Sequence, residues 1–543
     1  MKILFAFDFS MPMYNYNYIF PIGLLSLATI LKEKDYDVEI VDLNYLFLDK
    51  IINYDTDPMK NLETVAGYIT GKNPDIVGFT TTCSSFHNIL LLCRLIKNIN
   101  NKIKTILGGP QSAYMPEKIL ENYDWIDLIC PGEGEAKILD IVKGLEDNDL
   151  SSVHGIVYRN NGRISRNAES DLIKDLDTLP LLNYNLIPYP DRWEIAMEIT
   201  RGCPYNCIFC STADFWKHKF RRKSIERICK EILSVKNYSS KKQTHIIFTD
   251  DNFTTDYNFT MNLCRELQTL NIKWNCDARL DTLDEKLIKE MALAGCKFIL
   301  IGIESASPAI QKYINKHLNL EKLMYVVELM QENNIEPVPS FIYGFPSETE
   351  EDLNMTLNTI YSLFKQKAYR TILHSLCVLT GTQLFEDQKD NLILKDFYSD
   401  IADTENFELS RDMISGNKDL FSHFYIFKDS IASRYILLDK FVNFILKLHR
   451  FFPETITSLA GLFDDNILSF YKDFLITVPE FTDFFKNRNN FKLIKEQSAI
   501  VKHLIDFLTL YINKKSFNDF SYGMISHRFC NEKEELAKGV KSE

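Results

Sequence analysis

The sequence has no long apolar run, and this absence bears first on membranes. The longest candidate, residues 19–31, is interrupted by proline, glycine, serine and threonine, whereas a membrane span needs ~18–20 apolar residues. A shorter apolar run at the start of the chain is cut off by Asp8, and no small-residue cleavage site follows. This pattern favours a buried strand over a signal peptide. We therefore expect a soluble, cytoplasmic protein without a membrane span.

An excess of basic residues is also missing. The net charge is −12, which argues against a broad nucleic-acid-binding surface. No Gly-x-Gly-x-x-Gly fingerprint follows the first predicted strand, which argues against NAD or FAD. The ten histidines show no metal-ligand spacing. The twelve cysteines lie mostly in apolar or helical patterns, typical of reduced thiols rather than of a disulfide framework.

Three cysteines form a concentrated motif. Cys203, Cys207 and Cys210 lie in the run Glu198-Ile-Thr-Arg-Gly-Cys-Pro-Tyr-Asn-Cys-Ile-Phe-Cys210. Zinc sites and ordinary ferredoxin clusters take four protein ligands, but the next cysteine, Cys229, lies in a separate helical pattern. Three thiolates could hold a [4Fe–4S] cluster and leave one iron open. A structural zinc loop, or three unrelated thiols, is the alternative.

With Phe209 before its last cysteine, this run resembles the radical S-adenosylmethionine (SAM) superfamily. The resemblance implies that SAM chelates the open iron through its amino and carboxylate groups. It also implies reductive cleavage of SAM to methionine and a 5′-deoxyadenosyl radical, with an electron donor such as flavodoxin or ferredoxin as partner. Phe209 then belongs to the cofactor-binding site. An oxygen-sensitive cluster also calls for a reducing compartment.

Residues 1–145 alternate apolar runs with helical patterns, which predicts a parallel, doubly wound α/β sheet. Ligands of such sheets bind beyond the carboxyl ends of the strands, where Thr80, Thr82, Gly108, Gly109 and the turn 132–135 are expected. The predicted strands are 2–7, 38–41, 76–80, 105–107 and 128–130, and the predicted helices are 23–34, 85–98 and 116–121.

Four segments of this region, taken together, resemble the cobalamin (B12)-binding domain that precedes many radical SAM domains. They are Pro21–Leu25, Pro74–Gly78, Leu107–Pro110 and Gly132–Glu135. The resemblance implies a Rossmann-like cobalamin-binding domain over residues 1–145, with the four strand-end residues named above near the cofactor. The two glycines alone could also form only a tight turn. An Asp-x-His-x-x-Gly signature is absent, so no histidine of that motif is expected below the cobalamin.

The rest of the chain divides into three parts. Residues 146–190 read as a linker with a small hairpin at Asn160-Asn-Gly162. Six strand–helix units over residues 191–395 fit the partial (β/α)6 barrel that the radical SAM resemblance implies. Residues 396–543 hold 20 of the 38 phenylalanines in helical patterns and predict an α-helical domain in which the phenylalanines pack the core.

The radical SAM resemblance also assigns SAM-binding residues at the ends of barrel strands. Asp250 and Asp251 are candidates for the amino group, although one of them could instead cap a helix. Arg279 is assigned to the carboxylate, Glu304 to the ribose, and Gly344 to close approach beside the adenine.

Two further segments leave alternatives open. Residues 378–382, Val-Leu-Thr-Gly-Thr, stand where the family commonly carries Pro-x-Pro-Gly-Thr, which puts the conformation of that loop in question. The basic run 217–223 reads first as a solvated face, with contacts to SAM or cobalamin as the alternative.

The combined resemblance implies a cobalamin-dependent radical SAM enzyme that methylates an unactivated carbon of a metabolite, lipid or peptide. A non-methylating cyclase or rearranging enzyme is the alternative. A methylthiotransferase acting on tRNA would need three cysteines on N-terminal strand-end loops, whereas Cys93 lies in a helical pattern. A non-catalytic SAM-binding protein is a weaker alternative. No catalytic acid or base is identified.

Overall fold

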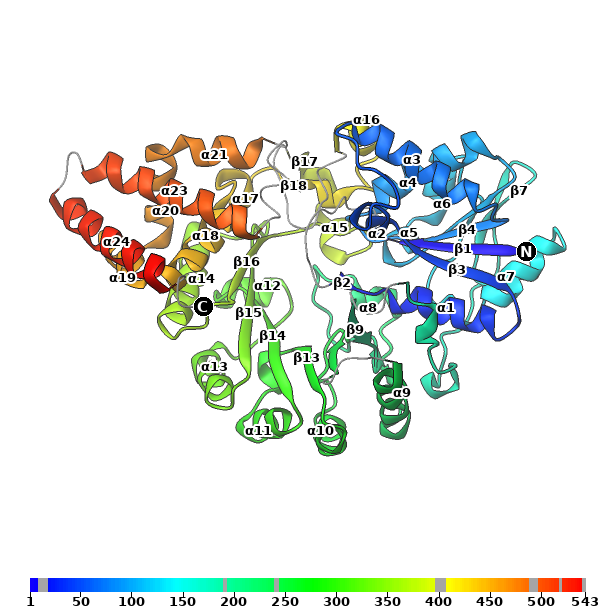
Figure 1. Ribbon diagram of the computed structural model, residues 1–543, viewed down its shortest axis with the longest axis horizontal. Coiled ribbons are helices and arrows are strands. Elements are labelled where there is room, and N and C mark those ends of the chain that lie inside the picture. Colours follow the sequence, from blue (N-terminus) through cyan, green and yellow to red (C-terminus); the bar gives the residue numbers. More distant parts are fainter. Residues whose placement is uncertain are drawn as a thin grey trace.

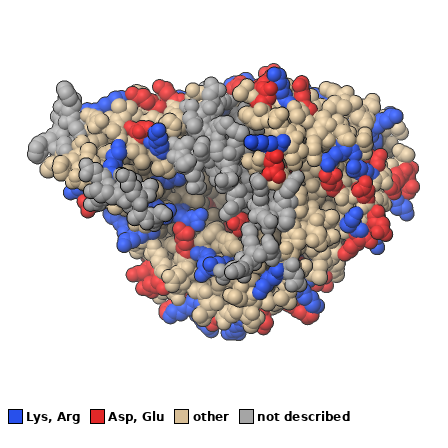
Figure 2. Space-filling model, viewed as in Figure 1, with Lys and Arg blue, Asp and Glu red and all other residues tan. Residues whose placement is uncertain are grey.

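The computed structural model describes residues 1–7, 18–188, 193–238, 244–395, 407–487, 497–516 and 520–539. Asp8 and residue 396, where the C-terminal domain is predicted to begin, lie outside these ranges. Along the described helices, none combines the length and the apolarity that crossing a bilayer takes. Acidic and basic side chains are interspersed over the face drawn in Figure 2.

The N-terminal sheet has the strand order β3-β1-β4-β5-β6-β7-β8 and carries helices on both faces (Figure 1). The first five strands are parallel, as the sequence predicts. Its strands are β1 (Lys2–Phe7), β3 (Asp37–Asp42), β4 (Ile76–Thr80), β5 (Lys104–Gly108), β6 (Leu128–Ile129), β7 (Val157–Asn160) and β8 (Arg163–Arg166). Its helices are α1 (Ile22–Lys32), α2 (Leu43–Leu48), α3 (Pro58–Gly71), α4 (Phe86–Ile99), α5 (Pro110–Ala113), α6 (Pro116–Asn122) and α7 (Ile138–Glu146).

Side chains alternate between the faces of this sheet because successive residues of a strand point in opposite directions. On β1, Ile3 and Phe5 join the core under α1 and α7, whereas Leu4 and Ala6 join the core under α3 and α4. The predicted hairpin is present as β7 and β8, but β7 pairs antiparallel with β6. This part of the predicted linker therefore extends the first sheet.

The second sheet is parallel throughout, in the order β16-β15-β14-β13-β12-β9-β2. Its strands are β2 (Tyr18–Ile19), β9 (Trp193–Met197), β12 (His245–Phe248), β13 (Lys273–Ala278), β14 (Cys296–Glu304), β15 (Glu336–Tyr343) and β16 (Ile372–Ser375). The accompanying helices are α9 (Ile225–Tyr238), α10 (Tyr257–Leu270), α11 (Glu285–Leu293), α12 (Pro308–Tyr313), α13 (Leu323–Glu332) and α14 (Glu350–Lys365).

The edge strands of this open sheet are β2 and β16. Strand β2, from the segment between β1 and α1, pairs with β9, a pairing that no local sequence pattern predicts. At the other edge, the Leu373 amide donates to Asn443 Oδ1 at 3.1 Å, and Asn443 Nδ2 donates to the Leu373 carbonyl at 2.9 Å. A side-chain amide thus satisfies backbone groups that an edge strand leaves unpaired.

The C-terminal region is mainly helical, with a short antiparallel strand pair added. That pair is β17 (Leu392–Leu394) and β18 (Tyr425–Phe427). The helices are α15 (Gln383–Gln388), α16 (Phe407–Gly416), α17 (Ile431–Arg434), α18 (Leu438–Phe451), α19 (Pro453–Gly461), α20 (Ile467–Thr477), α21 (Pro479–Lys486), α23 (Gln497–Ser516) and α24 (Phe520–Gly539). Phenylalanines such as Phe441, Phe470 and Phe474 are buried and contact one another, which confirms their predicted packing role.

The segment before β18 packs against the N-terminal sheet unit. Gln111 Nε2 donates to the Leu420 carbonyl at 2.8 Å, and the rings of Phe86 and Phe421 lie 5.4 Å apart. Since α16 also contacts α4, the C-terminal region touches the first sheet unit as well as the second.

Candidate functional site

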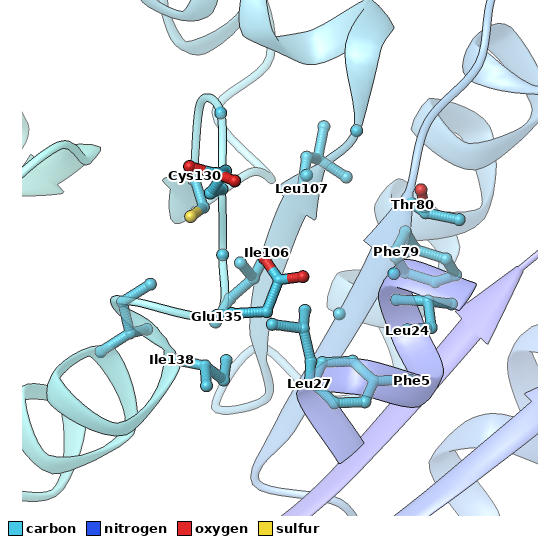
Figure 3. A pocket seen from close by; sticks show the side chains of 18 of the residues that line it. Phe5, Leu24, Leu27, Phe79, Thr80, Ile106, Leu107, Cys130, Glu135 and Ile138 are labelled. Carbon is cyan, nitrogen blue, oxygen red and sulfur yellow. The ribbon is translucent and has the colours of Figure 1, made fainter. Parts of the chain in front are cut away.

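A pocket runs along the face of the N-terminal sheet that α1 and α7 cover, from Ile3 and Ile76 to the carboxyl ends of the strands, where the topology predicts a ligand (Figure 3). The space free of atoms within it, including the open solvent at its mouth, is about 980 Å³. Figure 3 shows Leu24, Leu27 and Ile138 around this space, with the carboxylate of Glu135 among them. Glu198, Arg201, Phe215 and Trp216 line the pocket from the other side. The pocket therefore lies between the N-terminal sheet unit and the cysteine motif.

Of the four predicted cobalamin-binding residues, three line the pocket and one does not. Thr80, Gly108 and Gly109 line the pocket. Thr82 is exposed and outside that lining, and its hydroxyl lies 3.0 Å from Ser84 Oγ. None of the residues that line this pocket in the described chain is a histidine.

The adjacent glycines differ in what surrounds them. Gly109 has φ +90°, and a Cβ there would lie 2.7 Å from the backbone nitrogen and oxygen of Thr81. At Gly108 the nearest atom to an added Cβ would be the Cys130 carbonyl oxygen, at 3.9 Å. Gly109 therefore shapes the turn, whereas Gly108 leaves room beside the pocket.

The cysteine motif follows β9 and sits in a closed loop. The short strands β10 (Thr200–Arg201) and β11 (Arg221–Arg222) pair antiparallel and bring the two ends of the segment together, with α8 (Thr212–Phe215) between them. Gly202, directly before Cys203, has φ +93°, and a Cβ there would lie 2.1 Å from the Lys219 carbonyl oxygen. We call residues 202–211 the cluster loop.

Each of the three thiols is partly exposed. Burial raises the pKa of the Cys203 thiol to about 11, and the neighbouring Cys210 and Cys207 add to the effect. Burial also raises the pKa of Cys207, against the opposing influence of Lys316 and Arg279. Among the described residues, no three His, Cys, Asp or Glu side chains are gathered closely enough to hold a metal ion. The thiols would therefore have to turn toward a common centre to bind a cluster. As three thiols on one loop, they are nevertheless a donor set that suits one.

Asp250 and Asp251 both contact the segment that carries the cluster loop. Asp250 Oδ1 accepts from the Ile199 amide at 3.0 Å and from the Thr200 hydroxyl at 2.6 Å, and burial raises its pKa to about 7. Asp251 Oδ2 accepts from the Gly202 amide at 3.2 Å. Neither caps a helix; Asp256 caps the next one, α10. The helix-cap alternative is therefore wrong.

Arg279 and Glu304 lie around the same loop. The Arg279 guanidinium carbon lies 3.7 Å from the centre of the Tyr205 ring, which belongs to the cluster loop. Its Nε donates to Asp281 at 3.0 Å. Glu304 is buried, has φ +65° and pairs with Lys316 at 2.5 Å. The two cations that act on Cys207 are thus each held by a carboxylate.

Gly344 and Phe209 meet other parts of the chain. Gly344 has φ +101°, and a Cβ there would lie 2.6 Å from Ala432 Cβ on α17. The close approach that Gly344 permits in the structure is thus to this helix. The Phe209 ring packs edge-on against Phe345 at 5.8 Å.

The basic run after the cluster loop is mostly paired with carboxylates. Lys217 pairs with Glu169 and Arg222 with Asp256, both near the surface. Arg221 Nη1 instead donates to buried Glu133 at 2.9 Å, and Lys223 pairs with buried Glu231 at 2.7 Å. The solvated-face interpretation is wrong for Arg221 and Lys223.

Several pocket residues carried no sequence signal. Trp216 belongs to no ligand motif, and Leu27 appears only on the apolar side of the predicted helix 23–34. Arg201 and Leu24 lie inside quoted motifs, which assign them no role of their own. The sequence predicts that the turn 132–135 lies near a ligand. It does not predict that Glu133 of this turn pairs with Arg201, 68 residues further along the chain. Contacts between segments so far apart leave no local pattern.

The adjacent glycines Gly108 and Gly109 should respond differently to the same substitution. Gly109→Ala would put a side chain into a backbone conformation that costs ~1–3 kcal/mol for residues other than glycine, and would add the clash with Thr81. Gly108→Ala should change the free energy of unfolding by less than ~0.5 kcal/mol. Urea unfolding of both variants measures this, and equal effects would contradict the assignment of the turn to Gly109.

Buried Glu348 should make stability fall as the pH rises. Burial raises its pKa to about 8, against an opposing hydrogen bond from the Gly344 amide. Between the unfolded pKa near 4.5 and this value, the folded protein holds the extra proton, so the free energy of unfolding decreases by up to ~1.4 kcal/mol per pH unit. Glu348→Gln should flatten the decline between pH 5.5 and 8, whereas the exposed control Glu336→Gln should not. An unchanged slope in Glu348→Gln would refute this role.

Comparison with known proteins agrees with this geometry. The model of the radical SAM superfamily matches residues 197–360, and that of the B12 binding domain matches residues 16–142. An uncharacterised methyltransferase of Pyrococcus horikoshii is 30% identical over 375 residues, which cover 67% of this chain and 78% of the relative. An anaerobic magnesium-protoporphyrin IX monomethyl ester cyclase of Rubrivivax gelatinosus is 30% identical over 305 residues, or 53% of this chain and 54% of the relative.

A solved structure shows the same fold. The cobalamin-dependent S-adenosylmethionine radical enzyme OxsB, with aqua-cobalamin bound, matches with a TM-score of 0.61 at 18% identity, over 99% of this chain and 81% of that chain. The two family models in this order, together with the Pyrococcus relative, show that the chain belongs to the family of radical SAM enzymes with an N-terminal cobalamin-binding domain.

Proposed function

We propose that the protein is a cobalamin-dependent radical SAM methyltransferase acting on an unactivated carbon of a metabolite, lipid or peptide. The observation that carries this proposal is the pocket over the N-terminal sheet, which is bounded by Glu198, Arg201 and Trp216 next to the cluster loop. A methyl carrier bound there would lie beside the site of SAM cleavage. The Pyrococcus relative is named a methyltransferase, which supports the same activity.

In this proposal the bound cofactors supply the electron, the radical and the methyl group, while the chain binds and orients them. Cys203, Cys207 and Cys210 would hold the cluster, and an external donor such as flavodoxin or ferredoxin would reduce it. Arg279 and Lys316 would offset the negative charge of a thiolate-bound cluster, since both lie near Cys207.

The remaining assignments concern SAM and cobalamin. Asp251 and Glu304 stay candidates for SAM polar groups because each lies beside the cluster loop or its cations. Asp250 and Gly344 would act through the backbone that they position. For cobalamin, Thr80, Gly108 and Gly109 would bound the ligand, and none of the described residues that line the pocket is a histidine.

A non-methylating cyclase is the second candidate, because the Rubrivivax relative bears that name. It would use the same pocket and cluster loop. The two activities differ in whether a second SAM molecule is consumed as methyl donor.

Cofactor loading tests the two sites separately. Anaerobically reconstituted protein should carry about four irons. Replacing Cys203, Cys207 and Cys210 by alanine should abolish the absorbance of the cluster. The control variant Cys229→Ala/Cys530→Ala should keep that absorbance. Gly108→Phe should fill the pocket and weaken hydroxocobalamin binding at least tenfold by absorbance titration, whereas Gly67→Phe, on the exposed side of α3, should bind normally. A triple variant with the wild-type cluster spectrum would remove the cluster assignment. Normal cobalamin binding by Gly108→Phe would remove the pocket assignment.

The stoichiometry of SAM products distinguishes methyl transfer from cyclisation. A methylase that uses cobalamin as carrier consumes SAM as donor and again as radical source. Turnover with the true substrate should release S-adenosylhomocysteine and 5′-deoxyadenosine in about equal amounts, with label from the SAM methyl group in the product. Product formation with 5′-deoxyadenosine alone would favour the cyclase. Liquid chromatography with mass spectrometry measures all three products.

A further inference from the structure

The N-terminal sheet unit holds the cluster loop at its upstream end through Arg201. Arg201 Nη1 lies 2.5 Å from Glu133, Nη2 lies 2.6 Å from Glu135, and Nε lies 2.7 Å from Glu198. The Arg201 side chain is only 7% exposed. Because a buried charge that loses its partners is strongly destabilising, this geometry fixes Arg201, and with it the chain two residues before Cys203.

A second arginine strengthens the same contact. Arg221, paired with Arg201 across β10 and β11, donates through Nη1 to both carboxylate oxygens of Glu133 at 2.9 Å. The guanidinium carbons of Arg201 and Arg221 lie 5.6 and 5.3 Å from the Trp216 ring. The stem of the loop is thereby bound to the turn 132–135 of the first sheet unit.

The downstream end of the loop has its own anchor. The Tyr114 hydroxyl donates to the Ser211 carbonyl at 2.6 Å, and Ser211 follows Cys210 directly. The Tyr114 ring is held in place by Gly381, where an added Cβ would lie 2.0 Å from the ring. Tyr114 lies five residues after Gly109, at the end of α5. Both anchors therefore come from segments that bound the cobalamin pocket or directly follow it.

We propose that Arg201 and Tyr114 are positioning residues through which a ligand in the pocket fixes the cluster loop, so that cobalamin binding and SAM binding are energetically coupled. The inference rests on the proposed function for the identity of the two ligands. The Arg201 network reaches the pocket directly, since Arg201, Glu133, Glu135 and Trp216 all line it. Coupling of this kind is reciprocal, and each ligand changes the affinity for the other by the same factor.

Titrations on reconstituted full-length protein measure this factor. Hydroxocobalamin affinity is determined by absorbance with and without saturating SAM, and the electron paramagnetic resonance spectrum of the reduced cluster is recorded with and without cobalamin. In the wild type, SAM should change the cobalamin dissociation constant about fivefold or more, and cobalamin should alter the cluster spectrum. Tyr114→Phe, which removes one hydroxyl, and Arg201→Lys, which keeps the charge but cannot reach three carboxylates, should bring both effects close to zero.

Matched substitutions outside the network serve as controls. Arg370→Lys alters an exposed pair with Glu336, and Tyr257→Phe removes an exposed hydrogen bond to Asp284; both should retain wild-type coupling. If Arg201→Lys does not fold, Tyr114→Phe decides the question, with thermal unfolding and iron content as checks. If the wild type binds the two ligands independently, or if Tyr114→Phe keeps full coupling, the coupling inference is wrong. The proposed function is unaffected by either result. Wild type that binds no cobalamin overturns the proposed function and the coupling with it.

Discussion

The buried ion pairs of Arg201 are the interaction on which the arrangement of the two cofactor regions depends. An arginine in this position needs carboxylates on several sides, and two of them, Glu133 and Glu135, come from the turn after β6 in the other sheet unit. Leaving such a charge without partners costs several kcal/mol. The turn and the base of the cluster loop are consequently held in one relative position. Residues of both regions, among them Glu135 and Arg201 themselves, line the pocket.

The same constraint explains why the pocket and the cluster loop form one site. Parallel sheets collect loops at the carboxyl ends of their strands, and here Thr80 and Gly108 lie at such ends in the first sheet and Glu198 directly after a strand of the second. Neither sheet encloses the space alone. A ligand in the pocket would touch Glu133 and Glu135, whose hydrogen bonds reach Arg201, two residues before Cys203.

Local sequence patterns predicted most strands of both sheets and the cysteine loop because these depend on periodicity and short spacing. Contacts between distant segments were not predictable in this way. Strand β2 has two residues, too few for a period, and its pairing with β9 joins positions 18–19 to 193–194. The roles assigned by motif position show the same limit. Asp250 lies where the motif predicts, but its Oδ1 is used by the backbone at Ile199 and by Thr200.

The loop 378–382 shows how tertiary contacts can replace a local rule. Prolines would restrict the backbone of such a loop by themselves, and this chain lacks them. Instead, Thr380 Oγ1 donates to the Asp419 carbonyl and lies 2.9 Å from Ser422 Oγ, while Gly381 packs under the Tyr114 ring. The shape of the loop therefore depends on a C-terminal segment and on a residue of the first sheet unit. Since the Tyr114 hydroxyl also donates to the Ser211 carbonyl at the end of the cluster loop, one side chain of the first sheet unit contacts both the last strand-end loop of the barrel and the cysteine motif.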